Sequence, residues 1–109
     1  MSIDQWDESV RGEKMSSTSG RTIFKYQMPV LEHFTIKLPA GAEILRVEDQ
    51  DGMFWLWAVV NTGHDDEDRE FVAVKTGAPV PELNLKYVGF CKIYVQMELA
   101  LYIFEVIHG

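Results

Sequence analysis

The stretch EILRVEDQDGMFWLWAVVN, residues 43–61, decides the fold because it holds two strand-like runs joined at Asp51-Gly52. An Asp-Gly pair between such runs predicts a β-hairpin with a two-residue type I′ turn, which needs positive φ at both central residues. The second run, residues 53–60, is apolar on both of its faces. A strand without a polar face must be covered on both sides, so we expect this run to be a central strand.

Further runs rich in β-branched and aromatic residues lie on either side of this hairpin. Short strands separated by Gly, Pro and Asp turns, without a convincing long helix, predict an all-β fold. The fold class that we expect is a small antiparallel β-sandwich or partly open barrel of about seven strands. The predicted strands outside the hairpin are residues 22–28, 33–38, 69–76, 86–96 and 98–107, and the last two are joined by a tight reversal near Met97-Glu98.

Alternation along each strand predicts which side chains share a face. In the first arm of the hairpin, Leu45 and Val47 share one face, opposite Ile44, Arg46 and Glu48. The last strand is nearly apolar on both faces, and so is the strand at residues 53–60. Both strands therefore need cover on each side. Two sources of cover remain open: the other strands and the loop at residues 77–82 within one chain, or a symmetric homodimer.

Length and composition predict one domain with a tail. A chain of 109 residues, 47% of them hydrophobic, can bury one modest core. We assign residues 22–109 to a single β domain and residues 1–21, which contain a Ser/Thr/Gly cluster, to a flexible N-terminal tail. Ile3, Trp6 and Val10 have the spacing of a short amphipathic helix, which is the alternative to disorder.

Charge and cysteine content limit the kinds of function and the cell compartment that we expect. The formal net charge of −7 argues against nucleic-acid binding, which needs a cationic surface. No apolar run is long enough for a membrane helix, and residues 1–20 lack the apolar core of an export signal. The single Cys91 cannot form an internal disulfide, so we expect a buried thiol and a cytoplasmic protein.

One acidic segment, TGHDDED at residues 62–68, is a candidate surface site. Consecutive carboxylates repel one another and resist burial, so we expect an acidic surface loop before the strand at Arg69. A calcium loop is the alternative, but the spaced pattern of ligands that wraps one ion is absent. The residues of this predicted loop are His64, Asp65, Asp66, Glu67 and Asp68.

No convergent catalytic or metal-binding set is evident. The three histidines, His33, His64 and His108, lie far apart in sequence, which supports neither a triad nor a zinc site. We therefore expect no enzyme, no metal and no cofactor. Aromatic residues are the usual anchors of interfaces, although more of them lie in cores. The candidate interface residues are Trp6, Phe54, Trp55, Trp57, Tyr94 and Tyr102.

Six segments carry a resemblance to a known family: TIFKYQMPV (22–30), TIKLPAGAEILRVEDQDG (35–52), LWAVVN (56–61), EFVAVKTGAPVP (70–81), YVGF (87–90) and FEVI (104–107). In this order they resemble a family of short, uncharacterised proteins common in bacteriophages and prophages. The resemblance covers residues 22–109 and implies a compact β-rich phage protein with no known catalytic residue. Members commonly have a histidine in the last strand, where this chain has Tyr102.

Two functions are expected from these observations. The first is a non-enzymatic accessory protein that binds and sequesters or inhibits a host component, such as a defence protein or a small signal molecule, in the host cytoplasm. The alternative is a virion-associated or assembly protein that acts by self-association. The order of neighbouring genes separates them, because early small genes favour the first and capsid or tail genes the second.

Overall fold

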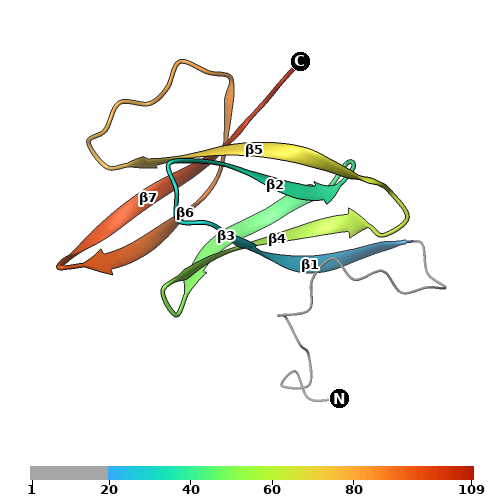
Figure 1. Ribbon diagram of the computed structural model, residues 1–109, viewed down its shortest axis with the longest axis horizontal. Coiled ribbons are helices and arrows are strands. Elements are labelled where there is room, and N and C mark those ends of the chain that lie inside the picture. Colours follow the sequence, from blue (N-terminus) through green and yellow to red (C-terminus); the bar gives the residue numbers. More distant parts are fainter. Residues whose placement is uncertain (1–19) are drawn as a thin grey trace.

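The computed structural model describes residues 20–109. These residues fold into seven antiparallel strands (Figure 1). They form a three-stranded sheet of order β1-β4-β3 and a four-stranded sheet of order β2-β5-β7-β6. The predicted all-β fold of seven antiparallel strands is confirmed. The strands are β1 (Arg21–Met28), β2 (His33–Pro39), β3 (Glu43–Gln50), β4 (Met53–Asn61), β5 (Asp66–Lys75), β6 (Leu85–Val95) and β7 (Met97–Val106).

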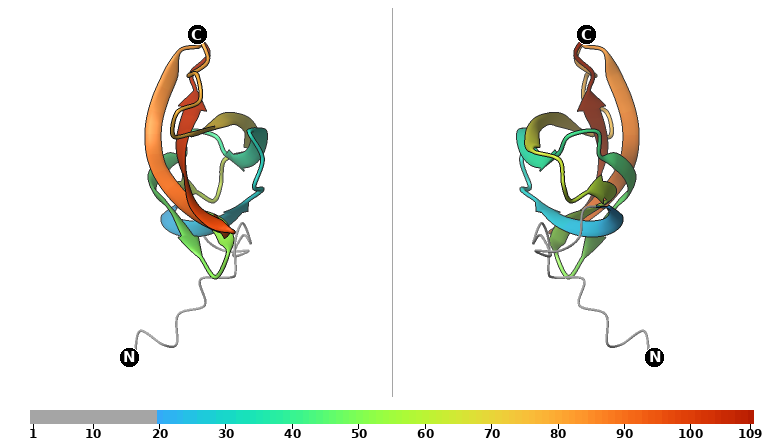
Figure 2. Two further views of the ribbon diagram at one scale, coloured as in Figure 1. Left: turned by 90° about the vertical axis from the view of Figure 1, so that its left-hand side faces the viewer. Right: turned by 90° about the vertical axis from the view of Figure 1, so that its right-hand side faces the viewer.

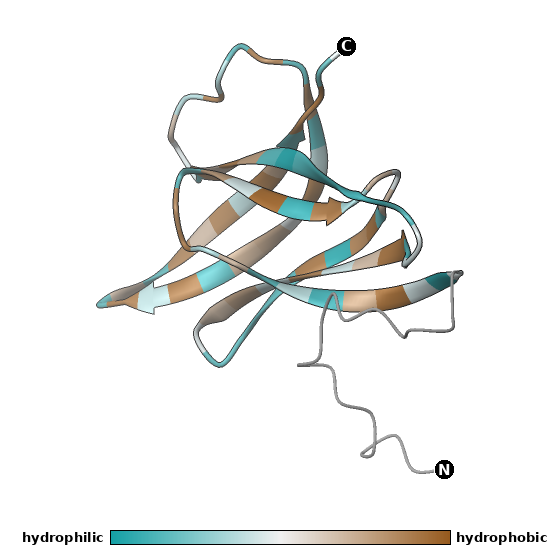
Figure 3. Ribbon diagram, turned by 45° about the vertical axis from the view of Figure 1, so that its right-hand side comes forward, coloured by the Kyte–Doolittle hydropathy of each residue, from teal (hydrophilic) through white to brown (hydrophobic). Residues whose placement is uncertain are grey.

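The two sheets curve around one interior (Figure 2). Side chains from both sheets meet there, and Phe54, Leu56, Phe71 and Ile103 are almost completely buried. Cys91 joins the same cluster as a buried thiol, as expected. Figure 3 shows how apolar and polar residues alternate along β2, the pattern of a strand with one buried face.

The predicted hairpin turn is confirmed by its backbone angles. Asp51 has φ of 53° and Gly52 has φ of 79°, while Gln50 pairs with Met53 across the turn. Both central residues therefore have the positive φ that a type I′ turn requires. The other tight reversal centres on Gln96, whose φ is 63°, one position before the predicted Met97.

β4 is the central strand of its sheet, as predicted. One face points inward, and Phe54, Leu56 and Ala58 are buried in the core. Cationic side chains of the neighbouring strands cover the outer face: Lys25 Nζ lies 4.2 Å from the ring centroid of Trp55, and Arg46 Cζ lies 4.0 Å from that of Trp57. Long basic side chains thus cover the tryptophans with their stems and bind the rings by cation–π contact.

A β-bulge corrects the face assignment in β3. Ile44 pairs with Ala58 and Arg46 pairs with Trp57, which leaves Leu45 as an extra residue. The prediction that Leu45 shares a face with Val47 is wrong, because the bulge shifts the alternation by one position. Ile44 packs against the core instead, and Leu45 is exposed.

β7 has two covered faces over its second half. Ile103 points into the main core, while Phe104 and Val106 pack on the opposite face with Val72 and Val74 of β5. Residues 76–84, which we call the proline loop, contribute Ala78 to this second cluster. Cover within one chain is thus present here.

Of the predicted N-terminal tail, residues 1–21, the structure describes only residues 20 and 21. β1 begins at Arg21, one residue earlier than expected. Residues 1–19, which include Trp6, lie outside the described residues. In residues 20–109, no helix is long and apolar enough to cross a membrane.

Candidate functional site

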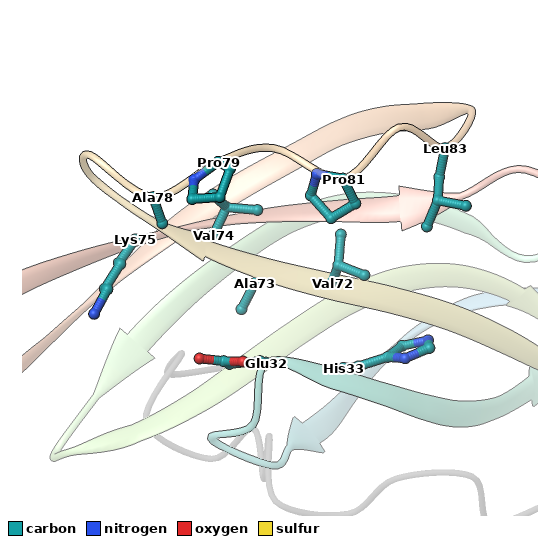
Figure 4. A pocket seen from close by; sticks show the side chains of 10 residues that line it. All are labelled: Glu32, His33, Val72, Ala73, Val74, Lys75, Ala78, Pro79, Pro81 and Leu83. Atoms are coloured by element: carbon teal, nitrogen blue, oxygen red, sulfur yellow. The ribbon is translucent and has the colours of Figure 1, made fainter.

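A pocket of about 440 Å³ lies between β5 and the proline loop (Figure 4). Val72 and Val74 form its floor, since they point from β5 towards the loop. Pro79, Pro81 and Leu83 stand over this floor on the other side. The remaining lining residues are Glu32, His33, Ala73, Lys75 and Ala78.

The local sequence explains why the proline loop stays open above β5. Gly77, with φ of 89°, reverses the chain just after the strand, and Ala78 N donates to Lys75 O at 3.0 Å. The prolines then fix φ and favour an extended path. At the far end, Ile107 N donates to Asn84 O at 2.8 Å, which ties the loop to the end of β7. The pocket wall is therefore held at both ends by backbone hydrogen bonds.

The end of β2 completes the opposite wall. Ala73 N donates to Glu32 O at 2.8 Å, immediately before β2 begins at His33. This bond extends the β2–β5 ladder by one step and holds Glu32 and His33 beside the pocket. The chain departs from β5 before Glu32, so nothing from β2 covers Val74 and Lys75.

Next to this wall, His33, Glu70 and His108 form a cluster of ionisable groups. His33 Nε2 contacts Glu70 Oε2, and His108 Nε2 lies 2.6 Å from Glu70 Oε1. Hydrogen bonds donated by His108 and His33 lower the pKa of Glu70 below its ordinary value. The carboxylate thus orients the imidazole of His33 at the pocket and fastens the chain end at His108 to β5.

Sequence reasoning treated these histidines as scattered and missed the cluster. Positions 33, 70 and 108 have no informative spacing, because their proximity depends on the sheet order β2-β5-β7. A single sequence carries no local signal for such a long-range set.

The pocket has the chemistry of a binding site. Its floor and loop wall are apolar, whereas Glu32, His33 and Lys75 supply a carboxylate, an imidazole and an ammonium group at its border. Pockets of about 300–1,000 Å³ with apolar walls and a few polar groups are typical of ligand sites. None of the ten lining side chains carries a hydroxyl or thiol nucleophile.

Only part of the predicted acidic loop is a loop in the structure. β5 begins at Asp66, so Asp66, Glu67 and Asp68 lie in a strand and the loop prediction is wrong for them, although all are exposed. Pairing with β2 offsets their mutual repulsion, because Lys37 Nζ lies 2.7 Å from Asp68 Oδ1. Glu67 Oε2 also accepts a hydrogen bond from Gly41 N at 3.1 Å.

His64 and Asp65 precede the strand and are exposed. His64 Nδ1 lies 2.8 Å from Ala40 O, and Ala40 N donates to Asp65 O at 2.8 Å. These contacts connect the turn between β2 and β3 to the turn between β4 and β5. Across residues 20–109, no group of three or more His, Cys, Asp or Glu side chains is arranged to hold a metal ion.

The structure separates the predicted interface aromatics. Phe54 and Trp57 are buried in their own chain, and Trp55 is half-buried beneath Lys25. Tyr94 and Tyr102 are exposed on the β6–β7 hairpin, and Tyr102 is the cross-strand partner of Val74 in the pocket floor. Of the described candidates, these two tyrosines have surface to offer a partner.

Comparison with known proteins places the chain in a family. No curated protein and no solved structure matches it. A family model described as a domain of unknown function, DUF7352, matches residues 19–108, which span the seven strands. The chain therefore belongs to the DUF7352 family.

Proposed function

We propose that this chain is a non-enzymatic accessory protein of phage type that sequesters or inhibits a host component in the host cytoplasm. Its ligand occupies the pocket between β5 and the proline loop. The observation that carries this proposal is the combination of an apolar floor, Val72 and Val74, with three ionisable groups at the border. The resemblance of six sequence segments to phage and prophage proteins supports the phage-type role of the chain.

The lining indicates the kind of ligand. An apolar body of modest size fits between the valines and the prolines, where it removes apolar surface from water. Lys75 favours an anionic group at one end, and His33 and Glu32 offer hydrogen bonds. A small amphipathic molecule with an anionic group meets these conditions, as does an apolar side chain on a partner protein.

Sequestration requires binding without turnover. The apolar floor and loop wall supply contact area that can hold a ligand, and the ionisable groups of the lining supply polar contacts. The His33–Glu70–His108 cluster positions a donor at the border rather than in the centre.

Affinity capture from host lysate tests this proposal. The full chain is retained on a column, and bound proteins and small molecules are identified by mass spectrometry. Leu83→Ser, on the wall, should reduce the captured ligand by about tenfold, because it removes apolar contact. Val80→Ser is the matched control, since Val80 is an exposed residue of the same loop that does not line the pocket.

Equal capture by Leu83→Ser and the wild-type chain would contradict the pocket assignment. Capture lost in both loop variants would show that the loop fold, and not the pocket lining, had changed. Thermal melts of both variants distinguish these cases.

Self-association, as in a virion-associated or assembly protein, is the second candidate function. The exposed aromatic residues of the β6–β7 hairpin favour it. Gene neighbourhood separates the two functions, because a block of capsid or tail genes favours assembly.

A further inference from the structure

A second cavity lies between the edge strands β1 and β2 and the turn that joins β4 to β5. Its volume is about 260 Å³. The residues that line it are Phe24, Tyr26, Lys37, Pro39, Thr62, Asp65 and Asp66. None of these described residues lines the pocket under the proline loop, which lies at the other end of β5. The two cavities are therefore separate sites, and a ligand of one does not depend on the other.

The inner part of this cavity is apolar. Tyr26 and Phe24 project from the core-facing side of β1, since Tyr26 is buried and Phe24 packs against the core cluster. Pro39, at the end of β2, is also buried. An aliphatic group placed against these rings leaves water, which is favourable, whereas a charged group placed there would lose its hydration. The interior thus suits an uncharged chain.

The mouth of the cavity carries negative charge. Asp65 and Asp66 are exposed and mark this mouth. Of the described lining residues only Lys37 is cationic, and its Nζ lies 2.7 Å from Asp68 Oδ1. Hydrogen bonding to Asp68 is the main cause that raises the pKa of Lys37, and Asp66 contributes less. Because Lys37 is paired with a carboxylate outside the lining, negative charge remains in excess at the mouth.

Backbone contacts hold the mouth in place. Asp65 O accepts a hydrogen bond from Ala40 N at 2.8 Å, and Asp66 pairs with Pro39 at the last step of the β2–β5 ladder. On the other side, Thr62 N donates to the carbonyl group just before β1 at 3.1 Å. The two carboxylates are therefore already gathered before a ligand arrives, which lowers the entropic cost of binding.

We propose that this cavity binds an alkylammonium group, with its short alkyl chain against the rings of Phe24 and Tyr26 and its charge at the mouth between Asp65 and Asp66. A volume of about 260 Å³ has room for one such chain. The ammonium group stays in contact with water and with two carboxylates, so its desolvation costs little. The formal net charge of −7 also attracts cations to the chain.

A metal ion meets these conditions less well. Calcium takes about six to eight oxygen ligands, and the apolar interior offers it none. Across residues 20–109, no group of three or more His, Cys, Asp or Glu side chains is arranged to hold a metal ion. An alkylammonium group, in contrast, uses both the apolar interior and the anionic mouth.

NMR titration of the ¹⁵N-labelled full chain with n-butylammonium tests the proposal. We expect saturable shifts of the amide signals of Thr62, Asp65 and Asp66. Methylammonium has the charge without the chain, and n-butanol has the chain without the charge, so each should bind about tenfold more weakly. Added salt should weaken the binding of n-butylammonium, because the mouth is exposed.

Removal of either carboxylate tests the role of the mouth. Asp65→Asn and Asp66→Asn should each weaken n-butylammonium binding by about tenfold, because each removes one charge-assisted contact. Asp51→Asn is the matched control, since it makes the same change of charge at an exposed turn position outside the lining, and it should bind like the wild-type chain. The amide spectra show whether each variant keeps the fold. The ligand series on the wild-type chain decides the question where a variant does not fold.

A free amine and a lysine side chain of a partner protein present the same group. Titration with a capped lysine, Nα-acetyl-lysine amide, distinguishes these two sources. Tighter binding of the capped lysine than of n-butylammonium supports a partner protein as the source, and the reverse order supports a free amine.

Equal binding of n-butanol and n-butylammonium would overturn the proposal, because charge would then play no part. So would the absence of shifts at the three named amides, or wild-type affinity in both asparagine variants of the mouth. Tighter binding of calcium than of n-butylammonium at the same amides would identify a metal site instead.

Discussion

Arg69 of β5 and Glu105 of β7 form a two-point ion pair inside the four-stranded sheet. Arg69 Nε donates to Glu105 Oε2, and Nη2 donates to Oε1 at 3.0 Å. The side chain of Glu105 is 7% exposed and that of Arg69 is 18% exposed. Hydrogen bonding to Glu105 raises the pKa of Arg69 above its ordinary value. The third contact, Arg69 Nη1 to Ala42 O at 2.9 Å, connects the pair to the loop before β3.

Removing one partner of this pair should destabilise the fold. Glu105→Gln keeps the volume but removes the buried counter-charge of Arg69 and leaves only the more exposed Glu67, 3.9 Å from Nη1, so we expect a loss of about 3 kcal/mol in unfolding free energy. Urea denaturation measures the loss. Glu98→Gln is the control, because Glu98 forms an exposed pair with Lys92, and it should cost less than about 1 kcal/mol. Equal losses in both variants would contradict this role for the buried pair.

The turn between β3 and β4 should reject a β-branched residue. Gly52 has φ of 79°, a region that Val resists, so Gly52→Val should lose about 1–3 kcal/mol. Thermal and urea melts give the change. Gly20→Ala is a matched control, since no φ in that region and no close neighbour restricts Gly20. An unchanged melting temperature for Gly52→Val would refute the turn assignment.

Acid should remove the contribution of the His33–Glu70–His108 cluster. The pKa of Glu70 is lower in the folded chain than its ordinary value of 4.5, because His108 and His33 donate hydrogen bonds to its carboxylate. The carboxylate therefore stabilises the fold above pH 4.5, and this contribution is lost as pH falls through the folded-state pKa.

Glu70→Gln tests this dependence by urea denaturation over a series of pH values. The variant should be less stable than the wild-type chain near neutral pH, and the two should converge below the folded-state pKa. Glu82→Gln, at an exposed position of the proline loop, should run parallel to the wild-type chain. A gap between Glu70→Gln and the wild-type chain that stays constant into strong acid would contradict the linkage.

Cys91 should be unreactive while the chain is folded. Burial raises the pKa of its thiol to about 12, so little thiolate exists at neutral pH, and the side chain is inaccessible. A thiol reagent at pH 8 should label the denatured chain quickly and the native chain at the rate of unfolding. Rapid labelling of the native chain would show that β6 opens locally.

The sequence alone determined the strands that depend on local chemistry. Asp51-Gly52 specified a turn because these residues tolerate positive φ, and the unbroken apolar run of β4 specified a central strand because it has no face for water. Such signals lie within a few neighbouring residues, where propensity and periodicity operate.

Tertiary structure decided what depends on register and sheet order. The bulge at Leu45 reversed one face of β3, and pairing with β2 drew Asp66 to Asp68 into β5. Only the order β2-β5-β7 brings His33, Glu70 and His108 together, and only the path of the proline loop over Val72 and Val74 creates the pocket. These features depend on contacts between residues distant in sequence, whose energies outweigh local preference and leave no trace in spacing.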